Sequence, residues 1–592
     1  MNTPNIDLTT LAIKSNGSSI PDEFQVSSVV VKKELNRISK AEITLLDGSA
    51  ETEQFPASDS STFVPGTEII IEAGYNDSNK SIFEGIVIGQ RLQIDQEQGS
   101  LLIVECYDKA IKMTVGQNSR SFFNQTDSDI LTTLINNNGL TASVSSTEVK
   151  WQQQVQHNAT DWDYLLSRAA ANSLLITNSN GRVTAQKPDK NTSSVLTAAY
   201  GESIFEIDIN LNASDQLSSV KASSWDYKDQ AQLSSTTKNT YSGPGNLSST
   251  QLSNVIDLED YNLQTTAVLD QKELTNWTQA QLLKSNYSKI QGEVKIQGTS
   301  SIEPLNYITL NGIGDRFSGD HLVSNVTHYI ESGVWVTKVS IGLLEKYLYK
   351  TIINDTHASG LIPAMKGLFN GIVKQIDGDP DHQYRILVDV PLMDNTGNGL
   401  WARYSNFYAS NNAGALFLPE IGDEVVLGCL NEDPRSIVIL GSLYSNPKNS
   451  PDKNLTLDNN NTVKALVTKS GLRLEFHEND NEILIATPNE NSIVLSDKEK
   501  NISIKDQNDN KFTLSDKGIS MTSPKDISIE ANGKLSLKGD QGVEMMANGG
   551  DVKTSGININ QRADMSYTAN ATQARIEGDA ELTLKGAMVM IN

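Results

Sequence analysis

The sequence has very little cysteine. Its 592 residues contain only Cys106 and Cys429, which lie about three hundred residues apart and in different predicted domains. A disulfide framework needs an even, closely spaced set of cysteines, so this chain does not carry one. The low cysteine content fits a reducing cytosol.

Cations are scarce as well. The chain carries 48 Lys plus Arg against 72 Asp plus Glu, which gives a net charge of −24, and no stretch is rich in Lys or Arg. Phosphate binding requires clustered cations, so the sequence argues against nucleic acid as a partner. The acidity favours instead the solubility of a large assembly.

Long apolar runs are also missing. No run approaches the ~20 residues of a membrane-spanning helix, and residues 1–7 lack the basic and apolar regions of a secretory signal. We therefore expect cytoplasmic assembly without a signal peptide and without stable membrane association. At 592 residues the chain has room for roughly three to five domains.

What the chain does contain is a regular repeat over residues 472–592. Short β-type segments alternate with Asn, Asp, Gly and Lys turns, and aromatic residues almost disappear. The most regular apolar pairs recur every eight residues: Ile519/Met521, Ile527/Ile529, Leu535/Leu537 and Val543/Met545. Apolar residues at i and i+2 are typical of strands that are buried on one face.

Eight residues per repeat are too few for one chain to enclose a core, since single-chain solenoids use about twenty residues or more per coil. Three copies around a threefold axis would bury the apolar pairs and leave no sheet edge open. We therefore predict an intertwined homotrimeric β-helical rod, a β-prism, with those eight residues in its core. An ordinary β-meander or a disordered tail is the alternative, although a disordered tail would not keep apolar pairs in register.

The rest of the chain is mainly β. The predicted domains are a first β-barrel (1–116), an α/β segment (117–201), a second β-barrel with one helix (202–349), a linker (350–366), a five-stranded barrel (367–446) and a connector (447–471) before the rod (472–592). Helices are predicted over 126–138, from the cap Thr160 onward, and over 273–285, where Trp277, Ala280 and Leu283 share a face. Asn180-Gly181 predicts a type I′ hairpin.

The most specific motif lies between residues 367 and 443. Five short strands joined by glycine-bearing turns match the size of an OB-type barrel. The motif positions are Pro419, Glu420, Gly422, Asp423 and Glu424, then Asp433 and Pro434, then Gly441. Their order resembles the OB domain of VgrG-type spike proteins, in which a Pro-Glu-x-Gly-Asp-Glu-Val segment precedes a Gly-Asp-Pro turn. Here Glu432 stands in place of that Gly.

Segments at 83–87, 156–165 and 319–328 resemble the hub portion of the same family. This resemblance implies a homotrimer at the centre of a contractile injection system: type VI secretion, an extracellular phage-tail-like particle or a contractile phage baseplate. It implies two hub barrels per chain, a hexameric inner tube protein and baseplate proteins as partners, possible effectors, and release with the particle into a target envelope on sheath contraction.

A tip partner is expected from the residues themselves. Apolar side chains and open strand edges remain at the last rung, formed by Met588, Val589, Met590, Ile591 and Asn592. Such an end aggregates unless it is covered. We predict that a PAAR-like tip protein covers it.

Catalysis is not expected, and no catalytic residue, metal or cofactor is predicted. The segment between Tyr444 and Leu472 is too short for a catalytic domain, and we expect no effector domain after the rung at 587–592. His477-Glu478 lacks the second His of a zinc motif and is read as a turn. The acidic segment 377–382 is read as a hairpin tip and not as a calcium loop, because it lacks the downstream Glu.

Two further sets of residues are expected to be structural. His157 and His328 are predicted to make structural hydrogen bonds. Trp401, Tyr404, Phe407 and Tyr408 are predicted to fill the barrel or a trimer contact and not to stack on bases or sugars. The alternative functions are a trimeric tail fibre or adhesin and a carbohydrate-active β-helix enzyme, which would require longer coils and a cluster of Lys, Arg and Asp.

Overall fold

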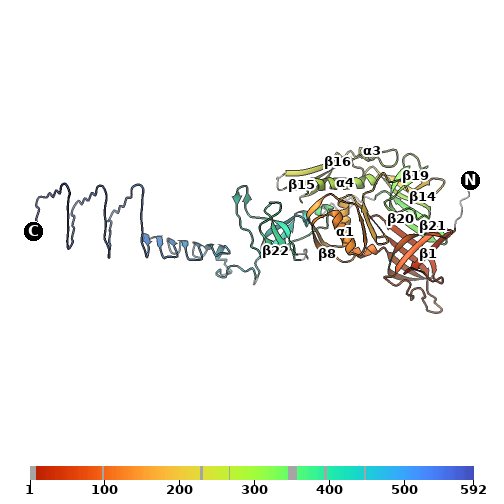
Figure 1. Ribbon diagram of the computed structural model, residues 1–592, viewed down its shortest axis with the longest axis horizontal. Coiled ribbons are helices and arrows are strands. Elements are labelled where there is room, and N and C mark those ends of the chain that lie inside the picture. The colour runs from red at the N-terminus through yellow and green to blue at the C-terminus, as the bar shows by residue number, and fades with distance from the viewer. Residues whose placement is uncertain are drawn as a thin grey trace. The chain divides into compact units, whose positions relative to one another are not determined.

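The computed structural model describes residues 8–96, 99–226, 231–265, 267, 269–343, 357–391, 397–445, 448–455 and 457–591. They divide into two compact units, Met1–Pro451 and Asp452–Asn592 (Figure 1). The predicted linker lies partly outside the described residues. No helix among the described residues is long and apolar enough to span a membrane.

Two strand-rich regions of the first unit share one sheet. The first region contributes β1 (Thr9–Ser15), β2 (Ser18–Ser19), β3 (Gln25–Glu34), β4 (Lys40–Leu46), β5 (Glu68–Tyr75), β6 (Ser78–Asp95) and β7 (Gly99–Tyr107). The second contributes β13 (Leu196–Ala199), β14 (Ile204–Leu211), β18 (Ile290–Gln297), β19 (Tyr307–Asn311), β20 (Gly319–Glu331) and β21 (Val334–Ile341). Antiparallel pairing of β3 with β20 joins them into a 13-stranded sheet.

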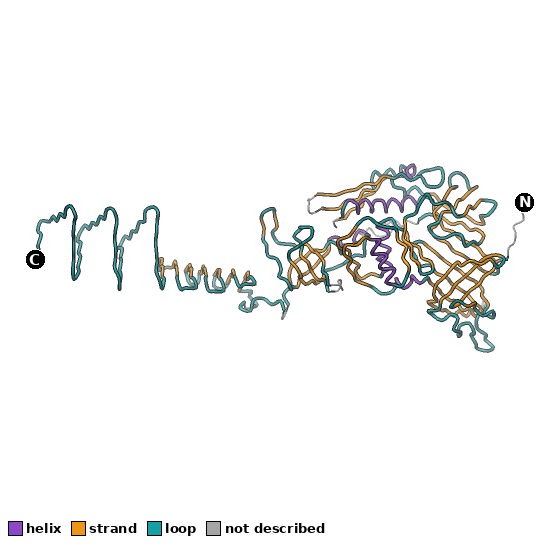
Figure 2. Tube along the Cα trace, viewed as in Figure 1, coloured by secondary structure: helices purple, strands orange, loops and turns teal. Residues whose placement is uncertain are grey.

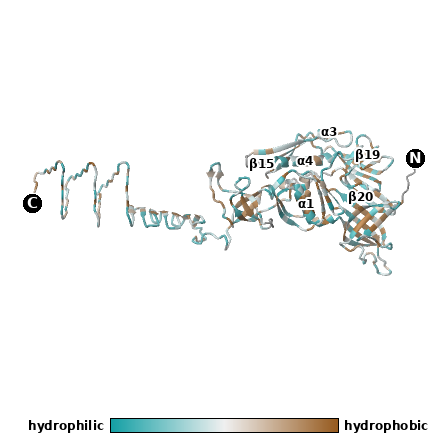
Figure 3. Ribbon diagram, in the orientation of Figure 1, coloured by the Kyte–Doolittle hydropathy of each residue, from teal (hydrophilic) through white to brown (hydrophobic). Residues whose placement is uncertain are grey.

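This pairing joins the two predicted hub β-barrels edge to edge in one sheet. The strands β3 and β20 pair with each other because an open edge offers backbone groups that a second edge satisfies. The sheet has two separate cores: Val29 and Ile43 lie in the first, which Ile330 and Trp335 of the second region also enter, and Val294 lies in the second. Figure 3 shows hydrophobic residues concentrated in this sheet.

An α/β segment follows the first region. Its elements are η1 (Lys109–Thr114), β8 (Asn118–Thr126), α1 (Asp127–Asn137), β9 (Thr141–Val144), β10 (Lys150–Ala159), α2 (Asp161–Ala171), β11 (Leu175–Ser179) and β12 (Arg182–Gln186). The predicted first helix is confirmed, since Ile130, Leu131, Leu134 and Ile135 are all buried on α1. The predicted hairpin is also confirmed, because Asn180 and Gly181 both have positive φ between β11 and β12.

A long helix covers a small three-stranded sheet in the same unit (Figure 2). The elements are β15 (Ser219–Asp226), β16 (Ala231–Lys238), α3 (Ser249–Ser253), β17 (Tyr261–Thr265) and α4 (Gln271–Tyr287). On α4 the predicted Trp277 and Ala280 are buried, but Leu283 is half-buried and Leu282 takes its place.

The predicted OB-type barrel is confirmed. Strands β22 (Phe369–Gln375), β23 (Ile386–Asp389), β24 (Leu400–Tyr404), β28 (Ile437–Ser442) and β27 (Glu424–Cys429) form a closed barrel in that order. Between β24 and β27 the chain makes a hairpin with β25 (Ala409–Ser410) and β26 (Ala413–Gly414). The short helices η3 (His357–Gly360) and η4 (Leu430–Glu432) lie beside one another next to the barrel.

The second unit begins as a β-meander. Strands β29 (Val463–Val467), β30 (Arg473–His477), β31 (Glu482–Ala486), β32 (Ser492–Ser496), β33 (Asn501–Lys505), β34 (Lys511–Ser515) and β35 (Gly518–Thr522) pair antiparallel with their neighbours. The first strand lies within the predicted connector, so the repeat starts before residue 472. Up to residue 522, the single chain therefore forms the meander that the sequence left as an alternative.

The eight residues that the sequence places in the core of a homotrimeric rod are exposed in the single chain. Their side chains are between 51% and 71% exposed; they are Ile519, Met521, Ile527, Ile529, Leu535, Leu537, Val543 and Met545. The physical reason is that one chain supplies only one wall of each rung, so nothing in the same chain lies opposite the apolar face. Their burial in a rod depends on other copies and stays a prediction.

Candidate functional site

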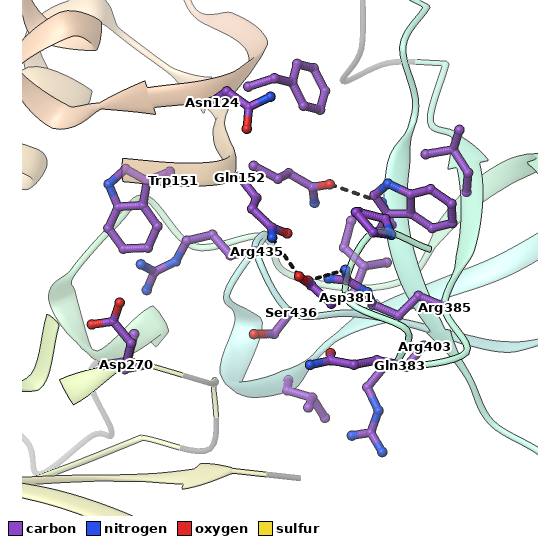
Figure 4. A pocket seen from close by; sticks show the side chains of 18 of the residues that line it. Asn124, Trp151, Gln152, Asp270, Asp381, Gln383, Arg385, Arg403, Arg435 and Ser436 are labelled. Atoms are coloured by element: carbon purple, nitrogen blue, oxygen red, sulfur yellow. Dashed lines mark hydrogen bonds and ion pairs between the residues drawn. The ribbon is translucent and has the colours of Figure 1, made fainter. Parts of the chain in front are cut away.

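The OB barrel and the α/β segment meet at a cleft of about 690 Å³ within the first unit. Its walls come from the β8–β10 ribbon, the start of α4 and the barrel (Figure 4). Gln152 Nε2 donates to Asp381 Oδ1 at 2.7 Å, and the Trp401 backbone N–H donates to Gln153 Oε1 at 3.0 Å. Val155 of β10 belongs to the same core as the barrel residues. The ribbon therefore fixes the barrel to the hub, and we call this region the hub–OB joint.

A buried ionic cluster lies beside the cleft. Arg168 of α2 makes two 2.8 Å bonds to the carboxylate of Asp127 on α1. Arg435, which follows η4, donates from Nη2 to Asp433 at 2.7 Å and from Nη1 to Glu273 of α4 at 3.3 Å. Two guanidinium groups thus share three carboxylates contributed by the hub and the barrel.

Trp151 of β10 lies between the two halves of this cluster. The Cζ atoms of Arg168 and Arg435 lie 5.0 and 4.9 Å from the centroids of its rings. A cation over a desolvated indole contributes about 2 kcal/mol. The indole therefore lies against both ion pairs and links the α/β segment to the barrel.

Burial sets the protonation of the cluster. It raises the pKa of Glu273 to about 7, and the charge of Arg435 only partly opposes the shift. Burial acts in the same direction on Asp127, but the charge and hydrogen bonds of Arg168 outweigh it and lower the pKa of that carboxyl. Asp127 is therefore ionised at neutral pH, whereas Glu273 exchanges its proton there.

The OB motif residues stabilise the turns between the barrel strands, and one of them belongs to the ionic cluster of the joint. The Glu420 N–H donates to Asp423 Oδ2 at 2.9 Å, and Gly422 has φ of +94°, a conformation that side-chain-bearing residues disfavour. The Val373 N–H donates to the Asp423 carbonyl, which ties this turn to β22. Of the remaining motif positions, Pro419 and Pro434 are buried, and the Glu424 carboxylate accepts a hydrogen bond from the Asn370 side chain. Gly441 of β28 pairs with Val426 of β27.

Asp433 is the motif residue that belongs to the ionic cluster, because it orients Arg435. Sequence reasoning missed Arg435, Glu273, Arg168 and Trp151. The one available signal was the position of Arg435 directly after the Asp433-Pro434 dipeptide. The others come from segments far away in the chain.

Several other sequence interpretations are settled by contacts. Asp379 accepts from Arg385 and from three backbone N–H groups, so segment 377–382 is a salt-bridged turn. His328 bonds Thr337 Oγ1 at 3.1 Å, as predicted, whereas His157 packs edge-on against Phe369 and its Nδ1 has no partner among the described residues. His477 ends strand β30 and bonds Glu475, and the predicted turn begins one residue later, at Glu478. No group of three or more metal-ligating side chains occurs in the described part of the chain.

The four aromatic residues that the sequence groups in the barrel do not share one environment. Trp401 lines the cleft and the Tyr404 hydroxyl donates to the Phe417 carbonyl at 2.9 Å. Phe407 and Tyr408 are exposed on the β25–β26 hairpin and do not fill the barrel, so for these two residues the alternative, a trimer contact, stays a prediction. They follow the end of β24, where the chain leaves the barrel wall.

The repeat segment, residues 463–591, carries a continuous apolar surface. In the meander, paired residues form two parallel files on one face. One file is Leu466, Leu474, Ile485, Ile493, Ile504, Phe512 and Met521; the other is Phe476, Ile483, Leu495, Ile502, Leu514 and Ile519. The exposed pairs Ile527/Ile529, Leu535/Leu537 and Val543/Met545 continue this pattern beyond the meander. One chain therefore leaves this surface uncovered.

Beyond Thr522 the backbone also lacks partners. Within residues 523–591, all of which are described, there is no strand and no backbone–backbone hydrogen bond. The predicted tip residues Met588, Val589, Met590 and Ile591 are exposed, and Asn592 lies outside the described residues. The same apolar pairs thus continue from a self-paired segment into a segment without pairing.

Comparisons with known proteins agree with this organisation. The family model described as the Alg8 N-terminal domain matches residues 5–332. The model described as the type VI secretion system/phage-baseplate injector OB domain matches residues 369–444, which confirms the predicted barrel family. No curated protein matches the chain significantly.

Solved structures are similar at low identity. A chain of the half-lidded Francisella PdpA–VgrG complex matches with a TM-score of 0.50 and 9% identity over 88% of both chains. An E. coli type VI secretion component, c3393, matches with 0.48 and 12% over 73% of this chain and 99% of that one. The 43 kDa tail protein of prophage MuSo2 from Shewanella oneidensis matches with 0.44 and 12% over 57% and 98%. The fold is thus similar to that of the VgrG complex chain.

The ionic cluster predicts a large effect of Arg435→Met. The substitution leaves Asp433 and Glu273 buried without their cation, which costs about 3–5 kcal/mol. Urea unfolding followed by tryptophan fluorescence should show an earlier transition. The matched control, Arg91→Met on an exposed strand position, should change stability by no more than about 0.5 kcal/mol. Equal midpoints for the two variants would contradict the role of the cluster.

The raised pKa of Glu273 predicts a pH dependence with a definite sign. Its pKa is about 7 in the fold against 4.5 ordinarily, so the native state binds the extra proton between these values. The contribution of Glu273 to the free energy of unfolding is fully present below pH 4.5 and is lost as the pH rises through 7, and the loss is on the order of 3 kcal/mol. Glu273→Gln should remove that loss, which unfolding curves at about pH 5 and pH 8 would detect; an unchanged pH slope would contradict it.

Proposed function

This chain belongs to the family of the Alg8 N-terminal domain, and we propose that it is the homotrimeric central spike and hub of a contractile injection machine. The observation that carries the proposal is the repeat segment: apolar pairs continue through residues 523–591 where the single chain makes no backbone hydrogen bond. In water-excluded surroundings every backbone N–H and C=O needs a partner. Identical copies supply both the missing strands and the cover for the apolar residues.

Three copies are the number that the repeat favours. Each eight-residue unit supplies a single wall with one apolar face, and three such walls close into a prism without free edges. Two walls leave edges open, and more walls leave a wide axial space that two apolar residues per rung do not fill. Burial of that surface at roughly 25 cal/mol per Å² holds the chains together and makes the rod stiff.

The first unit is proposed to connect the rod to the machine. Its sheet has two regions with separate cores, so three chains offer six such regions to a hexameric inner tube protein. Baseplate proteins would contact the outside of this hub. The hub–OB joint lies between the hub sheet and the barrel in the first unit, and its buried ion pairs and indole would carry thrust through that connection on sheath contraction.

The proposed role is mechanical and not enzymatic. The injector OB domain occupies residues 369–444, and the cleft beside it holds the ionic cluster that fixes the joint. Piercing of a target envelope, delivery of effectors and release with the particle follow from the spike role. No cofactor is needed for any of these steps.

The exposed residues Met588, Val589, Met590 and Ile591 are proposed to seat a PAAR-like tip protein. Replacing Met588 and Met590 by Glu should abolish its co-purification with the spike, because an apolar contact would strip water from the two carboxylates without offering them a partner, which is very unfavourable. Lys585→Glu, outside the tip residues, is the matched control and should retain the partner. Retention by both variants would place the tip protein elsewhere.

The trimer is tested by light scattering during size exclusion of the full chain. The expected mass is three times the 64.6 kDa of one chain. Leu535→Asp/Leu537→Asp should lower that mass or cause aggregation, since two charges enter the predicted core in each chain. Ser536→Asp, on the intervening position of the same rung, should leave the trimer intact. A folded monomer whose amides in 523–591 resist hydrogen exchange would overturn the proposal.

A further inference from the structure

The OB barrel carries an exposed hairpin with an unusual composition. Residues 405–418, which we call the arm, include β25 and β26 and contain no Asp, Glu, Lys or Arg, although charged residues make up 20% of the chain. Phe407 is 86% and Leu416 81% exposed, and Tyr408, Phe417 and Leu418 are exposed as well. A charge-free apolar projection is typical of the core of a protein interface.

The arm is held in shape by its own hydrogen bonds. The Ala415 N–H donates to the Tyr408 carbonyl at 2.9 Å, the Asn406 side chain donates to the Ala415 carbonyl, and Tyr404 bonds Phe417 at the root. Residues 409–410 pair with 413–414 (Figure 1). A preformed hairpin loses little conformational entropy on docking.

A second apolar patch lies on the outer wall of the same barrel. Leu368, which precedes β22, and Leu440 of β28 are 65% and 51% exposed. Both approach Gly428 of β27: a Cβ built there would lie 3.4 Å from Leu440 Cδ1 and 3.5 Å from Leu368 Cδ2. We call these three residues the seat. The two leucines thus flank the glycine and form one apolar surface with it.

A ring of identical copies needs two different contact patches on each copy, and the arm and the seat are two such patches on one domain. In a cyclic trimer each contact is head-to-tail, so one patch of a chain meets the other patch of its neighbour. The arm is exposed in the single chain and therefore does not fill the seat of its own barrel. The repeat segment follows the barrel after a short connector, residues 443–462, which keeps the barrels of assembled chains at high local concentration.

We propose that the arm of each chain docks its apolar side chains on the seat of the next chain, so that a second copy of this protein is its partner. The proposal rests on the trimer proposed above and adds the residues through which the barrels contact one another. Three such contacts close a ring around the axis and align the chains where the repeat begins.

Photo-cross-linking of the full-length protein tests this contact. Benzoylphenylalanine in place of Phe407 should cross-link, on irradiation of the trimer, to peptides containing Leu368 or Leu440. Mixed light and heavy isotope-labelled chains show whether the two peptides come from different copies. The same residue in place of Phe205, which is 59% exposed on the hub, should give no cross-link to the seat.

Substitutions in the seat sharpen the result. Leu440→Asp should reduce the cross-linked yield at least tenfold and increase amide exchange in 405–418, while Leu440→Met, which conserves volume, should keep both near the original values. Cross-links from one arm to another arm, to the same chain, or to a site other than the seat would overturn the proposal. So would a trimer without any cross-link.

The light-scattering mass separates the two proposals. A trimer that lacks the arm-to-seat cross-link refutes the contact and leaves the spike proposal standing. A monomer at every concentration refutes the trimer on which both depend.

Discussion

Backbone hydrogen bonding is the constraint on which this structure depends. Up to Thr522 each strand of the repeat segment pairs with its neighbour in the same chain, and after it the chain has the same apolar pairs without any partner strand among residues 523–591. An unpaired peptide group that is removed from water costs several kcal/mol in the least favourable case, and the segment contains dozens of them. The hub, the barrel and the meander therefore satisfy their backbone groups within one chain, whereas residues 523–591 do not; in the proposed trimer, other chains supply their partners.

The first unit solves a different mechanical problem. Its barrel is attached to the hub through a ribbon, a shared core and the cluster of Arg168, Arg435 and Trp151. Buried ion pairs add little net stability compared with apolar packing, but they define geometry because a misplaced charge has no alternative partner. In the proposed spike, where the joint must keep one orientation under load, this directionality is an advantage. The proton exchange of Glu273 near neutral pH is the cost of burying three carboxylates with two guanidinium groups.

The surfaces that remain uncovered follow the same logic. Exposed apolar residues form the arm, the seat and the files along the repeat, and others, such as Phe205, lie on the hub, while the cores of the hub and barrel are closed. Each of these three surfaces belongs to the barrel or to the segment that follows it. In the assembly proposed for the spike, copies of the same chain cover these surfaces. The contacts between barrels and the contacts within the rod then lie along one axis.

Much of the local structure could be predicted from the sequence, whereas only the tertiary structure decided which distant residues meet. The α1 face, the Asn180-Gly181 turn and the apolar pairs of the repeat depend on residues that are close in the chain, where periodicity and turn chemistry act directly. Arg435 and Glu273 are 162 positions apart, and neither their pairing nor the edge contact of β3 with β20 leaves a local pattern. The exposure of the arm became visible only once β24 was seen to end before it. Alternation and the eight-residue repeat predict Ile529 and Leu537 in the core of a trimer, and both residues are exposed in one chain. Alternation shows that a strand has a face to bury, but the chain that covers this face depends on contacts in space.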